Sequence, residues 1–147
     1  GMMCSPDIFR KVFAPHYRRV VEELKSHGIR ILQVDSDGEV RDLIRVMTEV
    51  GINGMHPFER AAGNDLMALR AEHPGFLMLG GVDKREIAKG KDAIRKEMDF
   101  VERLTRQGSF IPHFDHGVPP DISFENFQYY NELKLKILEH AGRRVGP

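Results

Sequence analysis

The chain has 147 residues, of which 41% are hydrophobic and 30% charged, a balance typical of a globular domain with its own core. Lys plus Arg and Asp plus Glu both number 22, and this formal net charge of zero argues against a nucleic-acid or anionic-membrane partner. No apolar run approaches the roughly 20 residues that span a bilayer, so no membrane segment is expected.

The start of the chain shows no signal peptide pattern. The single cysteine, Cys4, excludes an internal disulfide and fits a reducing compartment, so we expect a cytoplasmic protein. Gly1 before Met2 is interpreted as a remnant of tag removal. Residues 1–147 are interpreted as one domain.

Hydrophobic periodicity predicts one helix followed by four strand-helix pairs. The first helix starts at Ser5, a good N-cap before Pro6, and ends at Gly28. Short apolar runs predict strands at residues 29–34, 52–55, 76–79 and 109–114. Apolar residues at helical spacing predict helices at residues 37–51, 64–72, 84–107 with a break at Gly90, and 123–142.

This alternation predicts an α/β fold with a parallel sheet and helical crossovers. The strands are short and apolar without alternation, as expected for strands that are covered on both faces. Two architectures fit: an open sheet, or half of a (β/α)8 barrel, whose full form takes about 250 residues. No GxGxxG or GxxxxGK[ST] pattern follows a predicted strand, which weakens a nucleotide-binding interpretation.

Polar side chains gather where each predicted strand ends. Functional groups in parallel α/β folds lie at the carboxyl ends of the strands, so this distribution predicts one functional face. The four groups, in chain order, are Asp35-Ser36-Asp37-Gly38, His56-Pro57-Phe58-Glu59, Gly80-Gly81-Val82-Asp83 and His113-Phe114-Asp115-His116-Gly117.

The same segments carry a family resemblance across nearly the whole chain. Asp35-Ser36-Asp37-Gly38, residues 51–59, residues 80–85 and residues 115–126 come in the order of motifs in the uroporphyrinogen decarboxylase superfamily. The resemblance implies the C-terminal half of a (β/α)8 barrel: about four β-α units with an N-terminal helix. The superfamily contains uroporphyrinogen decarboxylases and zinc-dependent methyltransferases that work with corrinoid proteins.

The methyltransferase branch is the nearer relative by its motifs. Asp35 and Asp37 stand where that branch is similar to His-x-Cys-Gly, and His116 stands near its second Cys, before Pro119-Pro120. In that branch, these positions hold zinc. Decarboxylases have a His-Gly pair that His116-Gly117 resembles, but their main catalytic Asp and substrate-binding arginines lie in the N-terminal half, which this chain does not match.

The resemblance therefore implies a divalent metal, zinc or another, held by Asp35, Asp37 and His116. Glu59 is expected to act as a base or orienting acid, so the catalytic candidates are His116 and Glu59. Two carboxylates and an imidazole are more typical of a facial triad than of a thiolate zinc site.

Each candidate also has a structural alternative. Asp37 would serve as the N-cap of the second helix, and Asp35 as a solvated loop acid. Glu59 would form a surface ion pair with Arg60 or Arg85. Asp83 is expected to cap a short helix, and His56 to be a turn residue. His113 would point either into a barrel or into the helical layer, and the alternative role of His116 is to brace its loop through a carbonyl.

Three functions follow, and the chain's status as an enzyme on its own is open. The first is metal-assisted methyl transfer with a corrinoid protein, in a fragment that is incomplete as a catalyst alone. The second is decarboxylation of uroporphyrinogen or another tetrapyrrole, and the third is a non-catalytic subunit or truncated remnant. An open half-barrel face also predicts a homodimer, or assembly with the N-terminal half.

Overall fold

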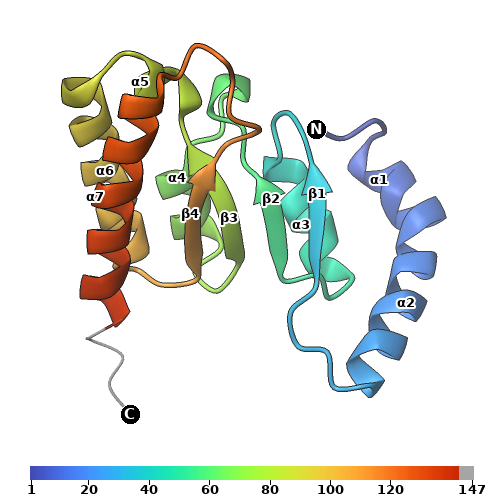
Figure 1. The fold of residues 1–147 in the computed structure, drawn as a ribbon. Coiled ribbons are helices and arrows are strands. Elements are labelled where there is room, and N and C mark those ends of the chain that lie inside the picture. Colours follow the sequence, from blue (N-terminus) through green and yellow to red (C-terminus); the bar gives the residue numbers. More distant parts are fainter. Residues whose placement is uncertain (143–147) are drawn as a thin grey trace.

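The computed structural model describes residues 1–142, which form a four-stranded parallel sheet flanked by helices (Figure 1). The strand order is β1-β2-β3-β4, so each strand pairs with its neighbour along the chain. The elements are α1 (Pro6–Ile8), η1 (Phe9–Phe13), α2 (Ala14–Ser26), β1 (Gln33–Ser36), α3 (Arg41–Glu49), β2 (Gly54–Pro57), η2 (Arg60–Ala62), α4 (Leu66–Glu72), β3 (Leu77–Val82), α5 (Lys84–Ala88), α6 (Lys91–Thr105), β4 (Phe110–Phe114) and α7 (Phe124–Gly142). Residues 143–147, the end of the predicted domain, lie outside the described residues.

The first helix begins where the sequence predicts it. The Ser5 hydroxyl accepts a hydrogen bond from the Ile8 N–H at 3.3 Å, and proline follows at the first helical position. The helix continues through the π-helical segment η1 into α2 and ends before Gly28, which has a φ of +82°. Glycine suits this left-handed conformation because it has no Cβ.

The first two strands start later than predicted. The apolar run at residues 29–34 forms a strand only from Gln33 onward. Before Gln33, the side chain of Asn53 hydrogen-bonds to the backbone in place of a neighbouring strand. The Asn53 amide accepts from the Leu32 N–H at 2.8 Å and donates to the Arg30 carbonyl at 2.7 Å. Regular pairing with β2 begins only beyond this point, so Asp35 lies inside β1 and His56 inside β2.

One face of the sheet packs against helices and the other is open. Alternate side chains of the strands point toward the helical layer and are at most 7% exposed, namely those of Met55, Met78, Phe110 and Phe114. Figure 1 shows α3 and α4 behind the strands, on this covered side. On the opposite face, Ile111 is 63% exposed. A closed barrel would enclose this open face, so the fold is that of a partial (β/α)8 barrel.

A buried arginine joins the lower ends of β3 and β4. Arg70 of α4 is 3% exposed and donates to the carbonyls of Pro74, Phe76 and Ser109 at 2.9, 2.8 and 2.8 Å. Burial lowers its pKa from the ordinary arginine value. These bonds satisfy carbonyls where the strands begin, because a guanidinium can donate in several directions at once.

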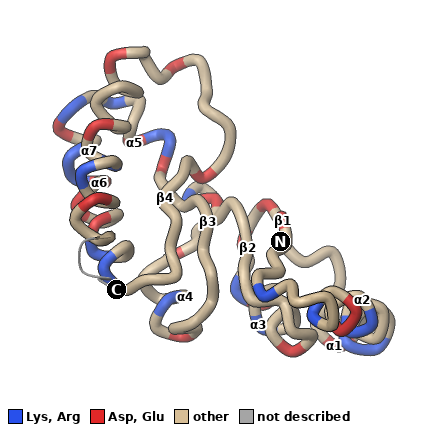
Figure 2. Tube along the Cα trace, turned by 60° about the horizontal axis from the view of Figure 1, so that its bottom comes forward, with Lys and Arg blue, Asp and Glu red and all other residues tan. Residues whose placement is uncertain are grey.

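Basic and acidic residues are mixed along the helices rather than separated by sign (Figure 2). This pattern agrees with the balanced composition and gives no extended field of one sign. Within residues 1–142, none of the helices is sufficiently long and apolar to cross a bilayer.

Candidate functional site

A cleft of about 260 Å³ lies at the carboxyl ends of β1, β2 and β4. It is lined by Asp35, Asp37, His56, Pro57, His113, His116 and Gly117. Its walls therefore carry two carboxylates and three imidazoles from three separate strand ends. The sheet brings these residues together because the carboxyl ends of parallel strands share one edge.

Three side chains at this edge lie close enough to share one metal ion. One ligand atom each of Asp37, Glu59 and His116 lies within 4.8 Å of the others. The His116 Nε2 atom is 4.0 Å from the Asp37 Oδ1 atom, and the two side chains are 55% and 69% exposed. The group differs from the predicted ligand set, since Glu59 takes the place of Asp35.

Glu59 is held in place by the backbone of the neighbouring loop. Its Oε2 atom accepts a hydrogen bond from the Gly38 N–H at 2.8 Å, which ties the loop after β2 to the loop after β1. Phe58, just before it, is fully buried and has a φ of +61°, an uncommon backbone conformation for a bulky residue. A buried anchor in this conformation directs the next residue, Glu59, toward Asp37 and His116.

Asn64 provides a second link between the same two loops. Its amide nitrogen donates to the carbonyls of Gly38 and Glu59, both at 2.8 Å, and its oxygen accepts from the Val40 N–H at 3.1 Å. The side chain is buried at 4% exposure, so these bonds are shielded from water. Sequence reasoning missed this residue and treated it only as the start of a helix.

Asp35 and His56 form a separate pair inside the cleft. The two residues are register partners in β1 and β2, and the His56 Nδ1 atom is 3.6 Å from the Asp35 Oδ2 atom. The rings of His56 and His113 lie 6.1 Å apart. His56 is therefore a strand residue and not a turn residue, and His113 faces the cleft on the open side of the sheet rather than the helical layer.

The structural alternative for Asp37 is wrong. Helix α3 begins at Arg41 with Val40 as its N-cap residue, and the side chain of Glu39 accepts the Arg41 N–H at 2.9 Å. Asp37 lies too far before this helix to cap it. The acid in this segment that meets a free helical N–H is therefore Glu39, not Asp37.

The predicted ion pairs of Glu59 are also wrong, because both arginines pair elsewhere. Arg85 binds Asp83, with 2.7 Å between Nη2 and Oδ2, and Arg60 lies 3.7 Å from the carboxylate of Glu97. Asp83 caps α5 as predicted, since it accepts the Arg85 N–H at 2.9 Å. Burial acts to raise the pKa of Asp83, but the hydrogen bonds from Arg85 outweigh it and hold that pKa below its usual value.

A buried carboxylate joins the two loops that carry Glu59 and His116. Asp115 has no exposed surface, and its Oδ2 atom accepts from the Arg60 N–H at 2.9 Å. Its Oδ1 atom accepts from the N–H of Lys84 at 3.3 Å and from the Lys84 ammonium at 3.2 Å. Because Arg60 follows Glu59 and Asp115 precedes His116, one hydrogen bond fixes the spacing of both site residues.

The glycine pair at the end of β3 permits close packing against β2. A Cβ atom at Gly80 would lie 2.0 Å from the Pro57 carbonyl oxygen, and Gly80 has a φ of +115°. A side chain at Gly81 would meet Leu66 at 2.2 Å. These two positions therefore require glycine, which explains their place in the motif without a chemical role.

Comparisons with known proteins agree with this fold and these motifs. The model of the uroporphyrinogen decarboxylase (URO-D) family matches residues 1–133. A uroporphyrinogen decarboxylase of Hydrogenobaculum sp. (strain Y04AAS1) is 27% identical over 66 residues, which are 44% of this chain and 19% of that protein. The chain thus matches only a small part of its curated relative, and no solved structure shows a significant match. The extent of the family match shows that this chain belongs to the uroporphyrinogen decarboxylase family.

Proposed function

We propose that the chain carries the divalent-metal site of a group-transfer enzyme within this family. The observation that supports the proposal is the approach of Asp37, Glu59 and His116, whose ligand atoms lie within 4.8 Å of one another at the carboxyl ends of the strands. The residues come from three loops, so their approach depends on the fold and not on local sequence.

The donor set fits a divalent ion of borderline hardness. One imidazole and two carboxylates suit zinc, manganese, nickel or iron better than a soft ion that prefers thiolates. Glu59 gives one oxygen to the Gly38 N–H, and its second oxygen remains for an ion. When bound, the ion would supply Lewis acidity to a substrate heteroatom. Asp37 and His116 would hold it beside open solvent, where a substrate has access.

The remaining cleft residues provide hydrogen bonding and proton transfer. His56, paired with Asp35, and His113 face the same space, where their ring nitrogens can donate or accept hydrogen bonds and transfer a proton to a bound substrate. In the methyltransferase-like interpretation, these rings bind and orient the acceptor, while Glu59 is the third ligand of the metal ion beside Asp37 and His116. The partner in that interpretation is a corrinoid protein, as the motif resemblance to the methyltransferase branch implies.

A second candidate function is decarboxylation of a tetrapyrrole-like substrate. It is favoured by the name of the curated relative and by the His116-Gly117 pair at the rim of the cleft. In this function, the imidazoles of His56, His113 and His116 would bind substrate carboxylates or return a proton to carbon. Carbon dioxide release from a tetrapyrrole, compared with methyl transfer to a corrinoid or thiol, distinguishes the two functions.

The metal proposal is tested by thermal unfolding with zinc, manganese or nickel. An ion that binds only the folded chain adds about 2.7 kcal/mol at a hundredfold excess over its Kd. For a domain of this size, that raises the midpoint by about 5–10 °C. Asp37→Asn, Glu59→Gln and His116→Ala are each expected to remove most of the rise.

Asp35→Asn is the matched control, because Asp35 lies in the same cleft but outside the group of three. It is expected to keep most of the rise in midpoint. If no divalent ion shifts the midpoint of the unsubstituted chain at millimolar concentration, the metal site does not exist. If Asp35→Asn removes the rise and Glu59→Gln does not, the ligands are Asp35, Asp37 and His116.

A further inference from the structure

Two histidines of the cleft at the strand ends lie outside the proposed metal site. His56 and His113 line the same space as Asp35, but neither belongs to the group of three residues that could hold the ion. The two rings are 6.1 Å apart and inclined by 59°, so they do not stack on each other. The ring nitrogens of these two residues therefore decide what kind of chemical group can bind beside the ion.

The backbone fixes the position of the proton on the ring of His113. The Nδ1 atom of this ring is 3.0 Å from the carbonyl oxygen of Phe114. A carbonyl oxygen only accepts hydrogen bonds, so Nδ1 must carry the proton. In the uncharged ring, Nε2 then has no proton and can only accept a hydrogen bond. Because Nε2 is the ring nitrogen farther from the backbone, His113 presents this acceptor to the cleft.

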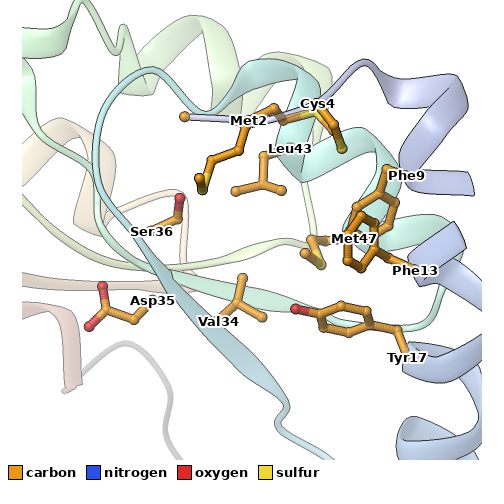
Figure 3. Close-up of a pocket in the computed structure, with 12 residues that line it drawn as sticks. Met2, Cys4, Phe9, Phe13, Tyr17, Val34, Asp35, Ser36, Leu43 and Met47 are labelled. Atoms are coloured by element: carbon orange, nitrogen blue, oxygen red, sulfur yellow. The ribbon is translucent and has the colours of Figure 1, made fainter.

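The carboxylate of Asp35 acts on His56 in the same direction. Figure 3 shows the side chains of Val34 and Asp35 on opposite sides of β1, with Val34 toward Tyr17 of α2. The His56 Nδ1 atom is 3.6 Å from the Asp35 Oδ2 atom, which is too far for a hydrogen bond, so Asp35 acts through its charge. A negative charge beside Nδ1 favours a proton on that nitrogen. The Nε2 atom of His56 is then an acceptor as well.

The charge of the cleft favours a ligand of the same kind. Asp35 and Asp37 both line it, and among the described residues no lysine or arginine side chain does. An anion would therefore approach two carboxylates without a cationic side chain to bind it. The two rings add hydrogen-bond acceptors to this negative charge. The lining thus suits a cation that donates hydrogen bonds and disfavours a carboxylate.

We propose that the cleft binds an amine as its substrate group. Bound as the ammonium ion, the amine would donate its N–H groups to the Nε2 atoms of His56 and His113 and face Asp35 and Asp37 with its charge. The inference rests on the proposed function, because the amine nitrogen would be the substrate heteroatom beside the ion. To react there, the ammonium gives one proton to an imidazole Nε2. The N–H bond breaks, its electron pair stays on the amine nitrogen, and the imidazole becomes charged.

The first test observes the two tautomers directly, by heteronuclear NMR of the isotope-labelled full chain. A chelator keeps the chain free of metal, and at about pH 8.5 imidazoles are mostly uncharged whereas simple amines stay protonated. Both His56 and His113 should carry their proton on Nδ1. Asp35→Asn should lower the ratio of Nδ1–H to Nε2–H in His56 by about twofold or more, since it removes the nearby charge. His113 should not change in this variant, because its partner is a backbone carbonyl.

The second test adds small probes to the same metal-free chain at constant ionic strength. Ethylammonium should shift the ring resonances of His56 and His113 and saturate, with a Kd of about 1 mM or above for so small a ligand. Tetramethylammonium, a cation without N–H groups, should bind about fivefold more weakly or less tightly still. Propionate, of similar size and opposite charge, should cause no shift. Asp35→Asn should weaken ethylammonium binding by about threefold or more, whereas Asp99→Asn, an exposed acid on α6, should not.

Three results would overturn the amine proposal. They are a proton on Nε2 of the uncharged His113 ring, saturable shifts caused by propionate, and shifts caused by ethylammonium that rise without saturation. The tests also separate this inference from the proposed metal site, because they use a chain without metal. An ion-induced rise in the melting midpoint without amine binding would refute the amine alone, and amine binding without that rise would refute the metal site alone.

Discussion

Asp115 should be essential for stability although it is expected to make no direct contact with substrate. The proposed change is Asp115→Asn, which keeps the size of the side chain and removes its charge. In the folded chain, the carboxylate accepts three hydrogen bonds, one from Arg60 and two from Lys84, and none of its surface is exposed. Asparagine has an NH2 group in place of one carboxylate oxygen, and this group would face the N–H donor of Arg60 or the donors of Lys84 without an acceptor between them.

The structure gives a magnitude for the loss of stability in Asp115→Asn. Removing one partner from a buried ion pair costs about 3–5 kcal/mol, because the other charge remains without compensation. Lys84 is 22% exposed and keeps some hydration, so the lower end of that range applies. We expect Asp115→Asn to lower the free energy of unfolding by about 3 kcal/mol and the melting midpoint by about 6–12 °C.

Urea unfolding followed by circular dichroism measures this free energy, with Asp121→Asn as the control. Asp121 is an exposed acid in the loop after β4, the loop that also contains Asp115. Its substitution should change the free energy of unfolding by no more than about 0.5 kcal/mol. The ion-induced rise in midpoint should also shrink in Asp115→Asn, since the Arg60–Asp115 bond sets the distance between Glu59 and His116. A loss below about 1 kcal/mol would refute the reasoning, because it would mean that water or a rearrangement replaces the three bonds.

Three further changes test other parts of the network. Arg70→Met should lower the free energy of unfolding by about 3 kcal/mol in urea, since it removes the guanidinium that donates to the Pro74 and Phe76 carbonyls and leaves the Ser109 carbonyl with the Met78 N–H alone. Asn64→Ala should lower it by about 2 kcal/mol and reduce the affinity for a metal ion in calorimetry, because it frees the loop that carries Glu59. Burial raises the pKa of Glu97 above its ordinary 4.5, so the folded chain holds a proton that the unfolded chain has released, and stability falls as the pH rises above about 4.5. Glu97→Gln should remove this fall, so the free energy of unfolding of the variant minus that of the unsubstituted chain should increase from pH 4 to pH 7 in urea unfolding. A difference that decreases over this range would contradict the assignment.

The order of elements was predictable because helical periodicity and glycine stops are local signals. The first helix begins at its Ser5 cap, and Gly90 separates α5 from α6 as expected. The start of β1 was not predictable, because it depends on Asn53, which comes from a different part of the chain and binds the backbone of the predicted strand. A side chain that replaces a ladder bond leaves no trace in hydrophobic periodicity.

The location of the candidate site was predictable, but its composition was only partly so. Parallel strands bring their carboxyl ends together, so residues after the strands had to approach one another. The motif alone could not distinguish Asp35 from Asp37, since the two residues are only two positions apart and the sequence does not show that β1 ends between them, at Ser36. Asp35 stays in β1 beside His56, whereas Asp37 lies past the strand and approaches Glu59 and His116. The roles of Asn64 and Asp115 were not predicted, because most of their partners are distant in sequence.

The open face of the sheet leads to the last prediction, the assembly of the isolated chain. Ile111 is 63% exposed there, and Leu77 and Leu79 of the neighbouring strand are only half-buried. Apolar side chains on an uncovered face favour a two-fold contact with a second copy, which would need to bury more than about 1,000 Å² to be specific. Ile111→Lys should convert a dimer at micromolar concentration into a monomer in sedimentation, whereas Leu135→Lys, on the exposed side of α7, should not. A well-folded monomer of the unsubstituted chain under these conditions would show that water alone covers the face, and that its apolar area is too small to drive association.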